Sequence, residues 1–173
     1  DTIRHAVSKM SDFHFTASEE YRNRVIQMGE SPDRVWNVGG FGIDGIVNIK
    51  KLSRSTIEKK LGTKFKKRNL LVTFHPETLG DINPIEQMIE LLAALDKSEC
   101  NLIFTMPNAD NGGKVLFKMI NDFVSLNPER ACAHVSVGSQ LYISAMYEVD
   151  GIVGNSSSGI IEGPAIKKGT INI

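Results

Sequence analysis

From residue 69 onward, short apolar runs of strand length alternate with longer segments in which apolar residues recur at helical spacing. The pattern predicts strands at 69–74, 101–105, 131–135, 151–154 and 170–173, with a helix between each strand and the next. These runs are apolar on both faces, which is typical of strands buried between two layers of helices. The alternation therefore predicts an α/β fold built on a parallel sheet.

The helix expected after the first strand has the clearest start signals. Asn83 stands at the capping position, Pro84 at the first helical position and Glu86 in the first turn. Because crossovers between parallel strands are right-handed, the predicted sheet is Rossmann-like, with the strand order 3-2-1-4-5.

Residues 1–50 follow a different pattern. Ser18 and the two glutamates after it predict the start of a helix, Gly29 predicts its end, and a short strand is predicted at 34–38. The first residue, Asp1, belongs neither to a normal translation start nor to a signal peptide, so we expect the chain to begin in the middle of a longer protein.

Lysine and arginine gather between these two parts of the chain. Residues 50–68 contain nine of them, and apolar residues interrupt the run at roughly helical spacing, at Leu52, Ile57, Leu61 and Phe65. This spacing favours the solvated face of a linking helix over a nucleic-acid patch. The predicted organisation is the tail of a preceding domain at 1–50, a linking helix at 51–68 and a truncated Rossmann-like domain at 69–173.

The overall composition limits the classes of partner. Twenty Lys and Arg balance twenty Asp and Glu, and this neutrality argues against a polybasic nucleic-acid surface. No apolar run approaches the ~20 residues that cross a bilayer, so no membrane is expected. The two cysteines, Cys100 and Cys132, have neither metal-binding nor redox spacing and are expected to be reduced, as in a cytoplasmic protein.

The candidate site follows from the predicted strand order. Ligands of such sheets bind beyond the carboxyl ends of the strands, where the strand order reverses, so the loops at 75–78 and 155–159 should face each other across one crevice. The second loop contains three serines before a helix, and their hydroxyls with the free backbone N–H groups would make an anion site. Glu162, one turn beyond Ser158, would accept hydrogen bonds from a ribose diol. The pattern favours a nucleotide diphosphate over serines that merely cap a helix.

His75 is the candidate for chemistry at this crevice. An imidazole titrates near neutrality, so it can donate a proton to a leaving diphosphate or pair with it as a cation. Asn108, after the second strand, could bind a sugar or base, while a helix cap remains an equal interpretation for Asp110. Glu77 is expected to be solvated and His134 structural.

Together these segments resemble the hydrolysing UDP-N-acetylglucosamine 2-epimerases. The resemblance covers essentially the whole chain and rests on His-Pro-Glu-Thr at 75–78, Pro-Asn-Ala-Asp at 107–110, Gly-Asn-Ser-Ser-Ser-Gly at 154–159 with Glu162, and the opening residues 1–11. The non-hydrolysing branch has an Arg-rich tetrapeptide after its histidine, so the form at 75–78 favours the hydrolysing branch. The resemblance implies the C-terminal half of a glycosyltransferase-B architecture, with part of the N-terminal nucleotide-like domain before it.

The resemblance also implies a reaction. UDP would be eliminated from the sugar nucleotide in an anti sense to give a 2-acetamidoglucal, and water would then add to release the manno epimer. His75 would contact the diphosphate and assist its departure. Ser156 and Ser157 would hold phosphate oxygens and Glu162 the ribose diol, in agreement with the interpretation of the residues themselves.

Further roles rest on the resemblance alone. Asn108 and the backbone at Val135 would flank the nucleotide, Arg4 matches a motif arginine, and Asp1 matches the second of two adjacent acids. Several parts of the family's site would lie outside this chain: the first of those two acids, the acids that handle the C2 proton, and a loop after the last strand. We therefore expect the chain to be inactive alone. The expected partners are a UDP-sugar and, in the full-length protein, a second copy in a homodimer. No cofactor or metal is expected.

Three alternatives stay open. A glycosyltransferase of the same architecture would share the diphosphate loop and the ribose-binding glutamate. A related epimerase would act on a UDP-linked diacetamido-trideoxy sugar. A non-catalytic module would bind UDP without turnover.

Overall fold

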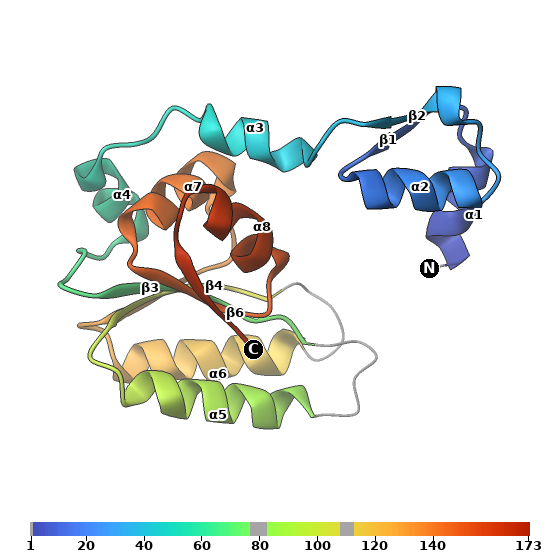
Figure 1. Ribbon diagram of the computed structural model, residues 1–173. Coiled ribbons are helices and arrows are strands. Elements are labelled where there is room, and N and C mark those ends of the chain that lie inside the picture. The colour runs from blue at the N-terminus through green and yellow to red at the C-terminus, as the bar shows by residue number, and fades with distance from the viewer. Residues whose placement is uncertain (1, 77–82, 108–112) are drawn as a thin grey trace. The chain divides into compact units, whose positions relative to one another are not determined.

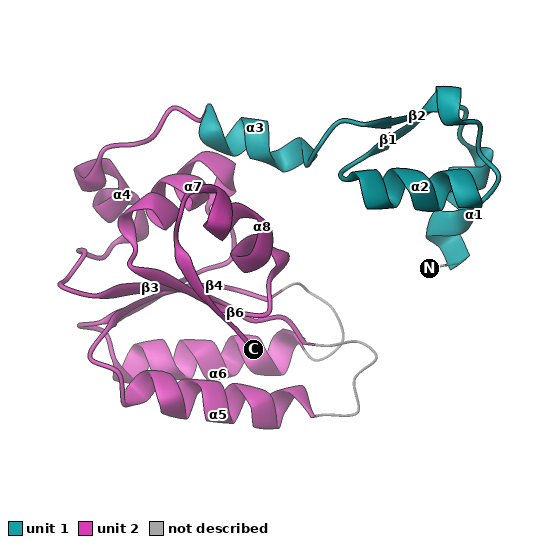
Figure 2. Ribbon diagram, viewed as in Figure 1, with its two compact units in different colours: residues 1–48 teal, residues 49–173 magenta. Residues whose placement is uncertain are grey.

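The computed structural model describes residues 2–76, 83–107 and 113–173 (Figure 1). The chain forms two compact units, residues 1–48 and residues 49–173 (Figure 2). Each unit is described by itself below.

The second unit contains a five-stranded parallel sheet. Its strands are β3 (Asn69–Thr73), β4 (Asn101–Thr105), β5 (Ala131–His134), β6 (Gly151–Gly154) and β7 (Gly169–Asn172). They lie in the order β5-β4-β3-β6-β7, and every neighbouring pair is parallel. In chain order this is 3-2-1-4-5, so the predicted Rossmann-like topology is confirmed.

Helices cover both faces of this sheet. One face carries α5 (Pro84–Asp96) and α6 (Gly113–Leu126), and the other carries α4 (Arg54–Leu61), α7 (Gly138–Glu148) and α8 (Ser157–Ala165) (Figure 1). The predicted start of α5 is confirmed, because the Asn83 side chain accepts a hydrogen bond from the Ile85 N–H at 3.0 Å and Pro84 opens the helix.

The core follows from strands that are buried on both faces. Val72 of β3 and Phe104 of β4 pack with Met88 of α5 and Leu116 of α6, and all four are at most 1% exposed. Leu71, the neighbour of Val72 on β3, is equally buried although it points to the opposite face of the sheet. Each β3 residue of this pair is therefore shielded by a different helix layer.

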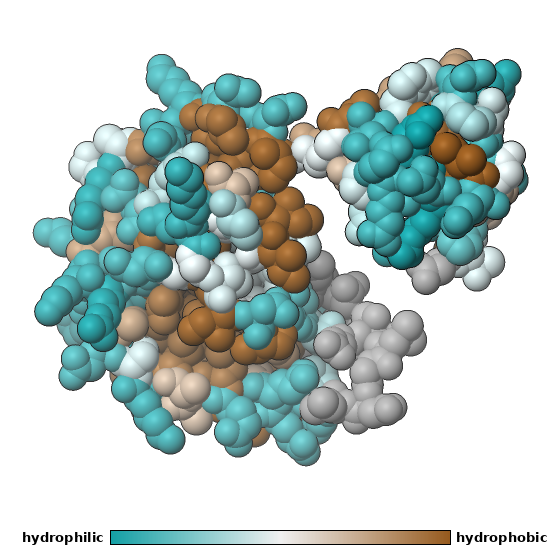
Figure 3. Space-filling model, viewed as in Figure 1, coloured by the Kyte–Doolittle hydropathy of each residue, from teal (hydrophilic) through white to brown (hydrophobic). Residues whose placement is uncertain are grey.

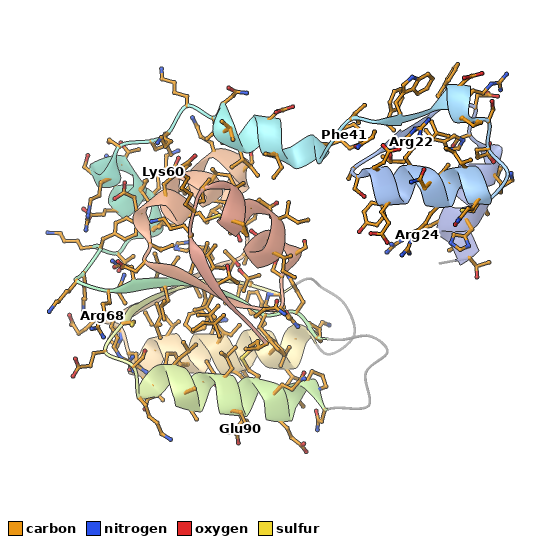
Figure 4. The ribbon with its side chains drawn as sticks, viewed as in Figure 1. Arg22, Arg24, Phe41, Lys60, Arg68 and Glu90 are labelled. Carbon is orange, nitrogen blue, oxygen red and sulfur yellow. The ribbon has the colours of Figure 1, made fainter. Side chains whose placement is uncertain are left out.

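The predicted linking segment 51–68 contains a helix shorter than the segment itself. This helix, α4, ends at Gly62, whose φ of 63° lies in the left-handed region that favours glycine. Ile57 and Leu61 of α4 are buried, whereas the cations are exposed; Figure 4 labels Lys60 and Arg68 among them. This segment belongs to the second unit.

A cavity of about 900 Å³ lies between α5 and strands β3, β6 and β7. Leu70, Val153, Ile171 and Ile173 line it from the sheet, and Figure 3 shows apolar residues gathered between α5 and the C-terminal strand. The cavity lies over the part of the sheet that α5 and α6 leave uncovered. Among the described residues that line it, the titratable side chains are Glu86 and Glu90 of α5.

The first unit is a β–α–β crossover with flanking helices. It contains α1 (Thr2–Met10), β1 (His14–Thr16), α2 (Glu19–Gln27), a 3₁₀ turn (Pro32–Arg34), β2 (Val35–Asn37) and α3 (Phe41–Val47). β1 and β2 pair in parallel, and the predicted cap of α2 is confirmed because the Ser18 hydroxyl accepts from the Tyr21 N–H at 3.2 Å.

The two faces of this small sheet differ. His14, Thr16 and Val35 are buried, whereas Phe15 and Trp36 stack on each other with their ring centroids 5.4 Å apart and remain exposed. Arg22 of α2, labelled in Figure 4, donates from Nε to the Val35 carbonyl at 2.9 Å and ties the helix to β2.

Candidate functional site

A cleft of about 410 Å³ opens at the carboxyl ends of β3, β4 and β6 in the second unit. Most of its lining residues have polar side chains. They come from the end of β3 and the loop after it, the end of β4, the loop after β5, and the first turns of α7 and α8. The lining residues are Thr73, His75, Thr105, Met106, Ser136, Val137, Gly138, Ser139, Tyr142, Ser156, Ser157, Ser158 and Glu162. The cleft therefore lies where the strand order reverses, as the sequence predicted.

The two predicted loops meet at this cleft. The His75 N–H donates to Oδ1 of Asn155 at 2.8 Å, and Nδ2 of Asn155 donates to the His75 carbonyl, also at 2.8 Å. The predicted juxtaposition of the loops after β3 and β6 is thus confirmed. It brings His75 to the same cleft as the serines that begin α8.

The serine loop forms the N-terminus of α8. Ser156 is the N-cap residue, and its hydroxyl accepts from the Ser158 N–H at 3.3 Å. Ser157 is exposed, whereas Ser158 is buried and shares a 2.8 Å hydrogen bond with the Tyr142 hydroxyl. A helix N-terminus carries partial positive charge and free N–H groups, so this end of the cleft suits an anion.

Glu162 lies one turn further along α8 and also lines the cleft. Its Oε2 atom is buried and finds no hydrogen-bond partner among the described residues. A buried acceptor without a partner is rare in folded proteins. The carboxylate is therefore suited to receive hydroxyl donors from a ligand.

Three of the predicted residues lie elsewhere or outside the described part of the chain. Val135 follows β5 directly and is 72% exposed, next to the cleft residues Ser136 and Val137. Arg4 is exposed on α1 of the first unit, and its place relative to the cleft is not defined. Asn108 lies outside the described residues.

The same holds for Glu77, Asp110 and Asp1, which also lie outside the described residues. His134, expected to be structural, has its Nε2 atom 3.1 Å from the Leu61 carbonyl and so joins the end of β5 to α4.

Sequence reasoning missed several contributors to the cleft. Asn155 was predicted only as part of the serine loop, and Tyr142 was not among the predicted site residues. The hydroxyls of Thr73 and Thr105, at the ends of β3 and β4, share a hydrogen bond at the cleft. Their position at strand ends was the one signal available, because residues at the carboxyl ends of parallel strands face the ligand crevice.

Other titratable groups have structural surroundings. Burial raises the pKa of Cys132 to about 11, so its thiol is neutral at physiological pH. Across residues 2–76, 83–107 and 113–173, no three His, Cys, Asp or Glu side chains cluster as a metal site would require. None of the helices in these ranges is both long and apolar enough to cross a membrane.

The parallel sheet, the crevice at its switch point and the serine-capped helix define the class: a Rossmann-like half of a glycosyltransferase-B architecture. Residues 1–173 match the family described as UDP-N-acetylglucosamine 2-epimerase, and the chain belongs to this family. The resemblance to the UDP-N-acetylglucosamine 2-epimerases that the motifs indicated is thus confirmed at the level of the family.

Two relatives are similar to this chain over nearly its whole length. It is 39% identical over 174 residues to a GDP/UDP-N,N'-diacetylbacillosamine 2-epimerase (hydrolyzing) of Campylobacter jejuni, covering 100% of this chain and 45% of the relative. It is 38% identical to polysialic acid biosynthesis protein P7 of Escherichia coli, covering 99% of this chain and 44% of the relative. The chain thus spans less than half the length of these relatives.

A solved structure shares the fold. The UDP-GlcNAc 2-epimerase of Neisseria meningitidis, solved with UDP-GlcNAc bound, superimposes with a TM-score of 0.75 at 16% identity, over 95% of this chain and 45% of that protein.

Proposed function

We propose that the protein carrying this chain is a hydrolysing UDP-N-acetylglucosamine 2-epimerase, and that this chain supplies its UDP-binding half. One observation carries the proposal: His75 and the N-terminus of α8 line the same cleft as Glu162, whose buried Oε2 atom has no hydrogen-bond partner among the described residues. The names of the relatives support a hydrolysing 2-epimerase of this family.

The reaction has two steps. Removal of the C2 proton and cleavage of the bond between C1 and the diphosphate oxygen release UDP and leave a 2-acetamidoglucal. Water then adds a hydroxyl to C1, and a proton returns to C2 from the opposite side, which gives N-acetylmannosamine. The acids that handle the C2 proton belong to the N-terminal part of the family's fold, which this chain includes only in part.

The residues of this chain act on the leaving group. His75 contacts the diphosphate and offsets the negative charge that develops on it as the C1–O bond breaks, or donates a proton to it. Ser156, Ser157 and the free N–H groups of α8 hold phosphate oxygens. Glu162 accepts from the ribose diol, away from the phosphates that its own charge would repel.

The remaining assignments belong to the same proposal. Asn108 and the backbone at Val135 flank the nucleotide, and Arg4 contributes from the N-terminal domain. Residues 1–50 are the tail of that domain, 51–68 link it to the UDP-binding domain at 69–173, and the full-length protein is a cytoplasmic homodimer. The chain on its own is inactive because acids needed for elimination and hydration lie outside it.

A second candidate substrate has its own support. Two relatives are named as N,N'-diacetylbacillosamine 2-epimerases, one of Campylobacter jejuni and one of Legionella pneumophila. The sugar-facing half of the site is not in this chain, so the cleft described here is compatible with either UDP-sugar.

The test is incubation of the full-length protein with UDP-N-acetylglucosamine and, separately, with the UDP-diacetamido-trideoxy sugar, following UDP and the released sugar by NMR. We expect UDP and a free 2-epimeric sugar without any acceptor. An absolute requirement for an acceptor sugar would identify a glycosyltransferase instead, and UDP binding without turnover would identify a binding module.

The matching variant is His75→Ala. Loss of a general acid lowers turnover by roughly 10²-fold or more. Near-normal turnover in this variant would remove His75 from the mechanism.

A further inference from the structure

We propose that Asn155 is a positioning residue, which fixes the main chain of His75 against the loop that begins α8. The inference rests on the proposed function, because His75 matters as a positioned group only if UDP leaves from this cleft. Asn155 itself does not line the cleft and acts only through His75.

The contact uses both polar ends of one side chain. Oδ1 of Asn155 accepts from the His75 N–H and Nδ2 donates to the His75 carbonyl, each at 2.8 Å, across 80 residues of sequence. A backbone N–H can only donate and a carbonyl can only accept, so the orientation of the amide is fixed by its partners. A side chain with one oxygen and one NH₂ group at this length is therefore required for both bonds.

The end of β6 is built to deliver this side chain. Thr73 of β3 pairs with Gly154 of β6, and the Asn155 N–H donates to the Thr73 carbonyl at 3.3 Å. Gly154 has a φ of 139°, and a Cβ there would lie 1.7 Å from the Thr73 oxygen. Only glycine permits this approach of the two strands, and it brings the side chain of the next residue within hydrogen-bond distance of the His75 main chain.

The arrangement joins the two parts of the site that act on one leaving group. Asn155 directly precedes Ser156, the N-cap of α8, so the histidine loop and the anion-binding helix end are held by the same residue. A fixed separation between the His75 loop and the N-terminus of α8 keeps the imidazole aligned with a diphosphate bound at α8. Misplacement of a reacting group by about 1 Å can lower a rate by about 10²-fold.

Two substitutions separate the two bonds. Asn155→Ala removes both of them. Asn155→Asp keeps the shape and an acceptor for the His75 N–H, but it places a carboxylate oxygen against the His75 carbonyl, where two acceptors repel each other. Asn127→Asp is the matched control, because its Nδ2 also donates to a carbonyl, that of Phe123 at 3.0 Å, at the end of α6 away from the cleft.

The experiment measures kcat and KM of the full-length protein with UDP-N-acetylglucosamine. It also measures hydrogen exchange of the His75 backbone N–H by NMR and thermal unfolding. We expect kcat to fall about 10- to 100-fold in both Asn155 variants, and KM to change little in Asn155→Ala. Neither kcat nor KM should change in Asn127→Asp. Exchange at His75 should accelerate in Asn155→Ala and stay slow in Asn155→Asp, which a loss of global stability would not produce.

The outcomes separate the two proposals. Absence of turnover in the wild-type protein, with either UDP-sugar, overturns the proposed function and this role with it. Wild-type turnover that both Asn155 variants retain within about twofold overturns the role of Asn155 alone. If Asn155→Ala does not fold, the isosteric Asn155→Asp decides the question by the same criterion.

Discussion

The close approach of β6 to β3 at Gly154 makes a quantitative prediction for Gly154→Ala. A Cβ at this position would lie 1.7 Å from the Thr73 oxygen, 2.6 Å from the Thr73 carbonyl carbon and 3.3 Å from its nitrogen. Because real Cβ contacts essentially never fall below 3.0 Å, the oxygen would have to retreat by about 1.3 Å. That retreat breaks the register of a central strand pair, Thr73 with Gly154, and the hydrogen bond from the Asn155 N–H.

The expected loss of stability has three contributions. The backbone conformation alone, in a region that non-glycine residues avoid, costs about 1–3 kcal/mol. The steric overlap adds strain of the overpacking kind, about 1–3 kcal/mol, and the lost backbone hydrogen bond about 1 kcal/mol. We therefore expect Gly154→Ala to lower the free energy of unfolding by about 4 kcal/mol or more, which is exceptional for one methyl group.

Gly62→Ala provides the control. Gly62 also has a positive φ, 63°, but in the described part of the chain no atom beyond its own chain neighbours lies within 4 Å of its Cβ position, so only the conformational cost of about 1–2 kcal/mol applies. Urea unfolding followed by far-UV circular dichroism measures both variants. Equal destabilisation of the two, or a loss below about 1 kcal/mol for Gly154→Ala, would refute the steric reasoning and with it the basis of the Asn155 contact.

Three further predictions concern individual groups. Glu162→Gln should weaken UDP binding by about 1–3 kcal/mol, because a charged acceptor is lost from the ribose contact, and unchanged affinity by calorimetry would contradict that contact. The hydrogen bond from Lys9 to Glu30 at 2.5 Å lowers the pKa of that carboxyl below its usual 4.5. The stabilisation that this pair gives the first unit is therefore complete above pH 4.5 and is lost as the pH falls through the lowered pKa; a carbon-detected NMR titration should show a higher midpoint in Lys9→Met. The neutral, largely buried thiol of Cys132 should resist iodoacetamide at pH 8 in the folded protein and react in urea, and rapid native alkylation would count against the raised pKa.

The fold was predictable from the sequence because its signals are local. Strands β3, β4, β5 and β6 are short runs rich in apolar residues, and α5 begins with a clear cap at Asn83 and Pro84. The last strand, β7 (Gly-Thr-Ile-Asn), carries a weaker signal and is largely exposed. Right-handed crossovers then leave few ways to order five parallel strands. The length of α4 was harder to predict, because Gly62 ends the helix while the basic residues continue to residue 68.

The site was predictable only in part because it depends on contacts across the sheet. The loops at His75 and Ser156 were found from the strand order alone. Asn155 contributes through two hydrogen bonds to a main chain 80 residues away, and no local pattern marks such a partner. The same is true of Tyr142, because its place in the sequence does not indicate the hydrogen bond between its hydroxyl and that of Ser158.

The distribution of charge also separates the candidate site from the basic segment. No Lys or Arg is among the residues lining the cleft, where the described groups suited to a diphosphate are the N-terminus of α8, its serines and His75. The basic segment 50–68 does not lie wholly away from this cleft, because the Lys50 carbonyl accepts from Nε2 of Gln140 in the first turn of α7 and the Leu61 carbonyl lies 3.1 Å from Nε2 of His134 at the carboxyl end of β5. None of its nine exposed cationic side chains lines the cleft. The described lining therefore offers an anion the dipole and N–H groups of α8, the serine hydroxyls and His75, and no lysine or arginine side chain.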